Sequence, residues 1–129
     1  YYTKLLANYF DFFPKVQLGK NFNGKGNLYQ LSLTKPNAQF EQINSLPGFL
    51  DGIGFMDDAH LIYSDWVSIT KPAPGAIYSY DLATQQTTTL ALPLNVRAPA
   101  DFAYSNGFLW LQQNLDNQVL VLNLSEPQK

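Results

Sequence analysis

The chain has 129 residues, a length that suits one domain with a buried core and is too short for two. Its formal net charge is −2 and its eight Lys and Arg are scattered singly, which argues against nucleic acid or an anionic membrane surface as a partner. Cysteine is absent, so disulfides and thiolate metal sites are excluded, and the redox compartment cannot be inferred.

Composition and spacing predict short β-strands and no helix. Hydrophobic residues make up 46% and aromatic residues 15%, and eight Pro and eight Gly punctuate the chain. The apolar residues alternate over short runs instead of recurring every three or four positions. The expected strands, bounded by turn residues as in an antiparallel meander, are residues 27–33, 40–43, 52–56, 61–66, 76–81, 87–92, 102–104, 108–112 and 118–124.

The first 25 residues are the least regular part of the chain. Residues 5–18 are apolar enough to include a strand, but Pro14 argues against a strand in the centre of a sheet. Residues 1–13 lack the small-residue cleavage pattern of a signal peptide, and no run approaches the eighteen apolar residues of a membrane helix. No membrane insertion is therefore expected.

Two pairs of segments repeat at one offset of 49 residues. Residues 26–33 (GNLYQLSL) and 75–82 (GAIYSYDL) align without a gap, with Gly first and Tyr in the middle. The same offset places residues 52–65 near 101–113, where GIGFM and HLIYSD are similar to DFAYS and FLWLQQ. Each period holds four expected strands, which is the size of a propeller blade. A β-sandwich or jelly roll also has regularly spaced strands, but lacks such a long-range repeat.

We therefore predict an all-β fold, a partial β-propeller of about two to three four-stranded blades. In a single partial domain spanning 1–129, residues 26–50 end one blade, 51–92 form a full blade, and 93–129 form a last blade without its outermost strand. Residues 1–25 are unassigned. Because ring closure takes ~4–8 blades, the remainder of the propeller is expected from an N-terminal portion of the same protein or from another chain.

The stretch LDGIGFMDDAHLIYSD (50–65) followed by GAIYSYDL resembles the blades of the senescence-marker-protein/gluconolactonase, or regucalcin-like, family. Those blades read Pro-Asp-Gly, a short strand, a turn, an apolar strand, then Gly-x-Ile and Asp. Residues 98–124 are similar to the last blade of exported members. The resemblance covers about residues 26–124 and implies a six-bladed ring, which at this period needs ~290 residues. It also implies a periplasmic or secreted location.

The same resemblance suggests a site. Catalytic members hydrolyse lactones with a divalent metal, often calcium, held by acidic and amide side chains near the central channel. Asp51 matches the Asp of the Pro-Asp-Gly motif, as catalytic residue and metal ligand, although Leu50 replaces the proline. Its carboxylate could ligate a hard cation or act as a base toward water. Asp101 is a second candidate metal ligand, but the 49-residue offset pairs it with Gly52. The alternative for Asp51 is a plain turn carboxylate that accepts nearby backbone N–H groups, and for Asp101 it is a plain residue at the start of a strand.

Other polar and aromatic residues are expected to be structural. Asp65 is expected to be a solvated loop carboxylate and His60 an exposed turn residue. Trp66 and Trp110 are expected in the core, although either could stack on a ligand. The polar cluster at residues 114–117 suits a hairpin loop, with oxygen donation as the alternative.

Two functions stay open. The first is a metal-dependent lactone or ester hydrolase with Asp51 in the site, whose remaining ligands lie on other blades. The second is a non-catalytic propeller that binds a small ligand or a protein through its top-face loops. A divalent ion in the channel and hydrolysis of a lactone would favour the first function.

Overall fold

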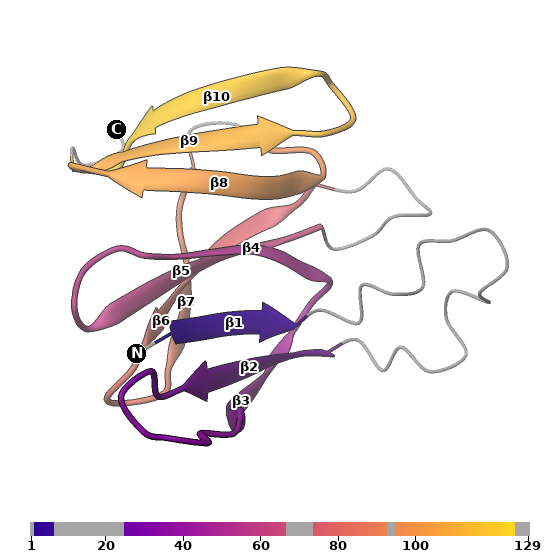
Figure 1. The fold of residues 1–129 in the computed structure, drawn as a ribbon. Helices are drawn as coiled ribbons and strands as arrows, with labels where there is room; N and C mark the ends of the chain where they lie inside the picture. Colours follow the sequence, from indigo (N-terminus) through magenta and orange to yellow (C-terminus); the bar gives the residue numbers. More distant parts are fainter. Residues whose placement is uncertain (1, 7–24, 67–73, 93–94, 126–129) are drawn as a thin grey trace, which may run out of the picture. The chain divides into compact units, whose positions relative to one another are not determined.

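The structure, a computed structural model, describes residues 2–6 (backbone only), 25–66, 74–92 and 95–125. These residues form ten β-strands in three antiparallel sheets, and no helix occurs among them (Figure 1). The predicted all-β class is thus confirmed. No helix of the described ranges is long and apolar enough to cross a membrane. The chain divides into two compact units, the first ending at Leu50 and the second beginning at Asp51.

The first unit contains a three-stranded sheet in the order β1-β2-β3. Its strands are β1 (Tyr2–Leu6), β2 (Lys25–Leu31) and β3 (Glu41–Pro47). Strand β1 falls in the segment that the sequence left unassigned, and it pairs along its whole length with β2. The register of β2 against β3 shifts between Leu28 and Tyr29. Leu28 and Leu46 are buried and give this sheet its apolar contacts.

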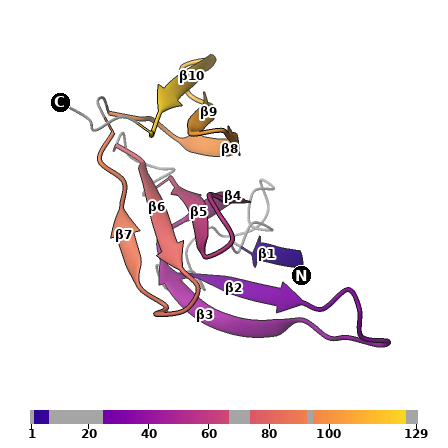
Figure 2. The same ribbon diagram turned by 90° about the vertical axis from the view of Figure 1, so that its left-hand side faces the viewer.

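The second unit contains a four-stranded sheet in the order β4-β5-β6-β7 (Figure 2). Its strands are β4 (Leu50–Phe55), β5 (His60–Asp65), β6 (Ala76–Asp81) and β7 (Thr87–Thr89). All six residues of β5 are at most half-exposed and five are buried, which marks it as a central strand. The four expected strands of one repeat therefore do form one sheet.

The second unit also contains a three-stranded sheet in the order β10-β9-β8. Its strands are β8 (Pro99–Ser105), β9 (Phe108–Gln113) and β10 (Gln118–Asn123). Asn106 and Gly107 have positive φ angles of 51° and 81°, the geometry of a two-residue type I′ turn between β8 and β9. An Asn-Gly pair suits such a turn, because both residues tolerate this conformation.

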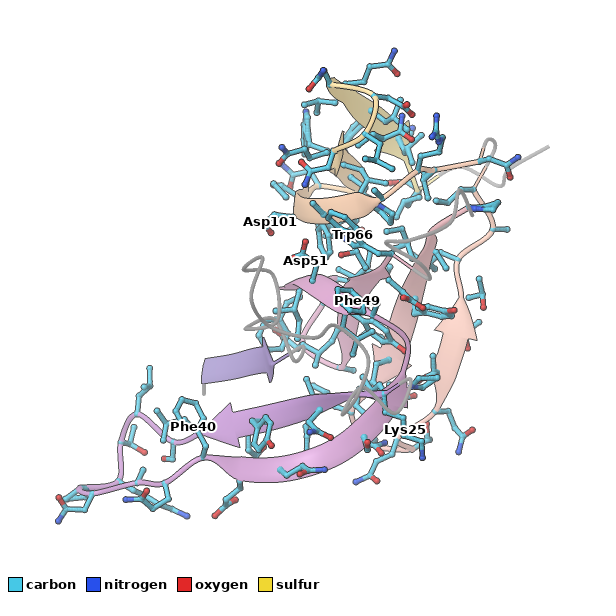
Figure 3. All side chains as sticks on the ribbon, turned by 90° about the vertical axis from the view of Figure 1, so that its right-hand side faces the viewer. Lys25, Phe40, Phe49, Asp51, Trp66 and Asp101 are labelled. Atoms are coloured by element: carbon cyan, nitrogen blue, oxygen red, sulfur yellow. The ribbon has the colours of Figure 1, made fainter. Side chains whose placement is uncertain are left out.

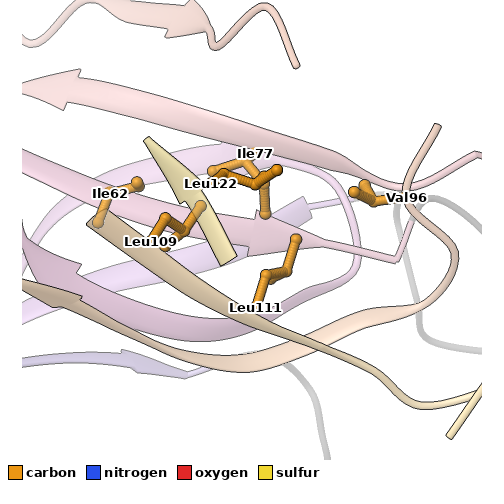
Figure 4. Close-up of a cluster of buried hydrophobic side chains, with 6 residues drawn as sticks. All are labelled: Ile62, Ile77, Val96, Leu109, Leu111 and Leu122. Atoms are coloured by element: carbon orange, nitrogen blue, oxygen red, sulfur yellow. The ribbon is translucent and has the colours of Figure 1, made fainter. Parts of the chain in front are cut away.

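The core of the second unit lies between its two sheets. Alternate residues of β9 are buried, and the buried ones meet side chains from β5 and β6. Each fully buried aliphatic side chain of this kind stabilises the fold by about 1.5–3 kcal/mol. The buried members of the cluster, shown in Figure 4, are Ile62, Ile77, Val96, Leu109, Leu111 and Leu122.

One close backbone approach occurs twice, at positions 49 residues apart. A Cβ atom added to Gly26 would lie 2.3 Å from Cδ1 of Leu50, inside the first unit. A Cβ atom added to Gly75 would lie 2.1 Å from Cδ of Pro99, inside the second unit. In each case the first residue of a later strand, Leu50 of β4 or Pro99 of β8, contacts a glycine at or just before the start of an earlier strand: Gly26 is the second residue of β2, and Gly75 directly precedes β6. The sequence repeat is therefore also a repeat of tertiary packing.

Two turns of the four-stranded sheet are held by carboxylates. Asp57 Oδ1 accepts the backbone N–H groups of Ala59 and His60, both at 2.8 Å. Asp81 Oδ1 accepts those of Ala83 and Thr84 at 2.8 and 2.9 Å. The His60 ring lies between them, with Nδ1 at 2.8 Å from Asp57 Oδ1 and Nε2 at 3.8 Å from Asp81 Oδ2.

These contacts predict a loss of stability in acid. The pKa of Asp57 lies below its ordinary value of 3.8, first because of the N–H of Ala59 and then because of the His60 side chain. The N–H groups of Thr84 and Ala83 lower the pKa of Asp81 in the same way. A carboxyl with a lower pKa in the folded state stabilises the fold above its unfolded pKa, and this contribution is lost as pH falls through the folded pKa.

We therefore expect the melting temperature to fall below about pH 4, and to fall less in the double variant Asp57→Asn/Asp81→Asn. Thermal unfolding followed by circular dichroism from pH 7 to pH 3 measures this. If the melting temperature fell equally with pH in the variant and in the native chain, Asp57 and Asp81 would not be the source of the acid sensitivity.

Candidate functional site

Asp51 is the second residue of β4, and it is partly buried beside Trp66, which follows the end of β5. Nε1 of Trp66 donates a hydrogen bond of 3.1 Å to Oδ2 of Asp51. The indole is 8% exposed, so it shields the carboxylate on one side and fixes one of its oxygens. Asp51 thus lies in a strand, and its carboxylate accepts a hydrogen bond from a side chain 15 residues further along the chain.

Asp101 is the third residue of β8, and its side chain is exposed. Figure 3 shows Asp51, Asp101 and Trp66 where β4 and β8 begin. The two carboxylates are close enough for the charge of Asp101 to act on Asp51. Asp101 Oδ1 also accepts the backbone N–H of Phe102 at 2.9 Å. The structure therefore brings the two predicted site residues together.

The pKa of Asp51 is raised above its ordinary value of 3.8. Burial is the largest cause, because it removes water from the charged form, and the charge of Asp101 adds to it. The hydrogen bond from Trp66 opposes both effects. A carboxylate with a raised pKa accepts a proton more readily than an ordinary Asp, which is the property of a general base.

Ser64 of β5 links β4 and β8 by hydrogen bonds next to Asp51 and Asp101. Its hydroxyl accepts the backbone N–H of Gly52 at 2.8 Å and donates to the carbonyl oxygen of Ala100 at 2.7 Å. Gly52 follows Asp51 and Ala100 precedes Asp101, so one fully buried hydroxyl fixes the distance between the two strand starts. Sequence reasoning missed Ser64, because its partners lie 12 and 36 residues away.

The pair supplies only part of a metal site. Carboxylate oxygens suit a hard cation such as Ca²⁺, which takes 6–8 oxygen ligands. Within the part of the chain that the structure describes, no group of three or more His, Cys, Asp or Glu is placed to hold a metal ion. The carboxylate oxygens of Asp51 and Asp101 are of the kind that Ca²⁺ binds, but two carboxylates provide fewer oxygen ligands than this cation takes.

Three expectations for other residues need correction or refinement. Asp65 ends β5 and is 4% exposed, so the expected solvated loop carboxylate is wrong. Trp110 is 38% exposed and does not belong to the buried core, unlike Trp66. His60, predicted as an exposed turn residue, is instead partly buried at the start of β5, and its ring contacts Asp57 and Asp81. The burial of Asp65 and the exposure of Trp110 depend on which neighbour covers each strand face, which local residue patterns do not encode.

The polar cluster at residues 114–117 forms the turn between β9 and β10, as expected, with Asn117 at a positive φ of 50°. Asp116 is paired with the Arg97 guanidinium at 3.1 Å. Beside this turn lies an open groove of about 270 Å³ that contains neither Asp51 nor Asp101. Its lining residues are Gln112, Gln113, Asn114, Asn117, Gln118 and Val119.

The site therefore consists of a partly buried carboxyl, an exposed carboxyl, an indole donor and a buried hydroxyl that sets the spacing of the strands. Its chemistry suits proton transfer or the binding of a small polar ligand. Comparison of the chain with protein-family models, with the curated proteins and with the solved structures found no match.

Proposed function

We propose that the chain is a sector of a β-propeller of the regucalcin-like type, which hydrolyses a lactone or similar ester at Asp51. The observation that carries the proposal is the partly buried Asp51 carboxyl with its raised pKa, between the Trp66 indole and the charge of Asp101. In this role Asp51 takes a proton from the attacking water, and Trp66 orients its carboxylate.

The propeller part of the proposal is supported by the tertiary repeat. Gly26 contacts Leu50 at the start of β4, and Gly75 contacts Pro99 at the start of β8. The same glycine contact therefore recurs after 49 residues. A sandwich of two sheets has no need for such a repeat, whereas a ring of similar blades does. The remaining sheets of the ring would come from other sequence of the same protein or from another chain.

A divalent cation at this site would need ligands in addition to Asp51 and Asp101. Asp51 and Asp101 would hold it together with those ligands, and it would supply charge stabilisation for the reacting carbonyl oxygen.

The variant Asp51→Asn tests the catalytic role. The amide oxygen keeps an acceptor for Trp66 Nε1, whereas Asp51→Ala would remove it at a cost of about 1–2 kcal/mol. We expect hydrolysis of a lactone panel by the assembled protein to fall about tenfold or more. Asp57→Asn is the matched control, since it makes the same charge change at a hairpin turn. Undiminished hydrolysis in Asp51→Asn would remove Asp51 from the mechanism.

A second candidate is a propeller that binds a small polar ligand without turnover. It is favoured by the hydrogen bond from Trp66 Nε1, which occupies the Oδ2 atom of Asp51. The chain has two Trp, so in a Trp110→Phe variant the fluorescence reports on Trp66 alone. Quenching by a sugar or lactone that is not hydrolysed would support this candidate over the hydrolase.

A further inference from the structure

The groove beside the turn between β9 and β10 is lined almost entirely by carboxamide side chains. Its volume of about 270 Å³ lies just below the ~300–1,000 Å³ of sites for drug-sized molecules, so it suits a compact ligand of about one ring. Apart from Val119, every lining residue is Asn or Gln. We name it the amide groove and define it as Gln112, Gln113, Asn114, Asn117, Gln118 and Val119.

The amide groove carries no charge, because the ions at this turn are paired with each other outside its lining. Nη1 of Arg97 donates to Oδ1 of Asp116 at 3.1 Å, and neither residue lines the groove. The backbone N–H of Arg97 donates to Oε1 of Gln113 at 2.8 Å, which holds this buried side chain in the wall. A second groove, in the first unit, differs in that Lys35 and Glu41 both line it. The amide groove therefore offers neither a cation for an anionic ligand nor a carboxylate for a cationic one.

The carboxamides keep hydrogen-bonding capacity for a ligand. Nε2 of Gln112 donates to Oδ1 of Asn114 at 3.1 Å, which fixes these two side chains relative to each other and leaves the Oε1 of Gln112 and the Nδ2 of Asn114. The side chains of Asn117 and Gln118 make no hydrogen bond to other residues that the structure describes. A carboxamide both donates and accepts, and a hydroxyl group does the same. Neighbouring hydroxyls on one small molecule are thus the groups that match this lining.

We propose that the amide groove binds a neutral, hydroxyl-rich ligand of about one ring, either a free sugar or the terminal sugar of a glycan. The lining residues come from both strands and from their turn, so they surround a compact ligand, whereas an extended peptide would lie along one strand edge. Val119 supplies an apolar contact for the C–H groups of such a ring. The groove contains neither Asp51 nor Asp101, so the inference goes beyond the proposed hydrolase and does not depend on it.

Two-dimensional ¹H–¹⁵N NMR of the 129-residue chain tests the proposal, since the NH₂ groups of Asn and Gln give signals of their own. We expect glucose or maltose to shift the groove NH₂ signals with a dissociation constant of about 1–10 mM, because a small ligand makes few contacts. Asn117→Asp removes a donor and Gln118→Met removes the amide without adding charge, and each should weaken binding about threefold or more. Asn106→Asp is the matched control, since Asn106 and Asn117 have φ angles of 51° and 50° in turns at opposite ends of β9.

The probes also separate the two sources of the ligand and the competing classes. Shifts with glucose identify a free sugar, and shifts with maltose alone identify the end of a glycan; both support the proposal. An absence of shifts with either sugar would overturn it, as would equal shifts in Asn117→Asp, Gln118→Met and the native chain. Stronger shifts with trialanine would identify a peptide site instead. Asp51→Asn should bind sugar normally, and a loss of binding in that variant would place the ligand at the proposed hydrolase site and overturn the inference.

Discussion

Replacing Gly75 with Ala is expected to lower the free energy of unfolding by about 3 kcal/mol or more. The new Cβ would lie 2.1 Å and 2.5 Å from Cδ and Cγ of Pro99 and 2.9 Å from the carbonyl oxygen of Asp65. The proline ring is fully buried and rigid, and the carbonyl belongs to the backbone at the end of β5. Neither can move aside without shifting a strand, so urea-induced unfolding should show a clear loss.

Two further variants separate this clash from a general glycine effect. Pro99→Ala removes the ring, so the double variant Gly75→Ala/Pro99→Ala should recover part of the loss, giving a favourable coupling energy in a double-mutant cycle. Gly26→Ala meets the flexible end of the Leu50 side chain, and we expect a smaller cost of about 1–2 kcal/mol. Equal costs at the two glycines and no coupling to Pro99 would show that the contact does not determine the effect.

Ser64→Ala is expected to cost about 2–3 kcal/mol, since it removes the partners of two buried backbone groups. The N–H of Gly52 and the carbonyl oxygen of Ala100 would both lose the hydroxyl that now bridges them. The loss should appear in urea-induced unfolding and also as faster hydrogen exchange at the Gly52 amide. Ser105→Ala, at an exposed position of β8, is the control and should change stability little.

An unchanged exchange rate at Gly52 in Ser64→Ala would contradict the bridging role, even if stability fell. If the bridge also positions the carboxylates, Ser64→Ala should reduce hydrolysis in parallel with Asp51→Asn but less severely, because Ser64 acts only through the strand spacing.

Much of the strand layout was predictable, because the apolar alternation and the turn residues are local signals. The segment expected at 76–81 is β6 without change, and that expected at 118–124 is β10 to within one residue. The segment expected at 87–92 is shorter, since β7 ends at Thr89. The N–H of Leu90 still donates to the carbonyl oxygen of Ile77. The chain therefore stays beside β6 for one residue after the regular pairing of β7 with β6 has ended. The all-β class follows from such signals, whereas closure into a ring depends on contacts that no single strand encodes.

The candidate site was predictable in its carboxylates and not in its supporting residues. Asp51 was identified by the Asp-Gly motif. Its pKa is raised mainly by burial, which depends on residues that lie outside the motif. Ser64 lies near the end of β5, and its hydroxyl is buried against Ala100 of β8, 36 residues further along the chain, which the local sequence does not indicate. Asp101 has two roles: its carboxylate accepts the N–H of the next residue in β8, and its charge raises the pKa of Asp51.

The contacts of Gly26 with Leu50 and of Gly75 with Pro99 also limit which substitutions these four positions can accept. A larger side chain at either glycine is tolerable only when the facing strand start shrinks at the same time, so each pair should covary among homologous chains. Insertions in the turn between β6 and β7 should be tolerated, because the contact fixes where β8 begins in space and not the length of the turns that precede it.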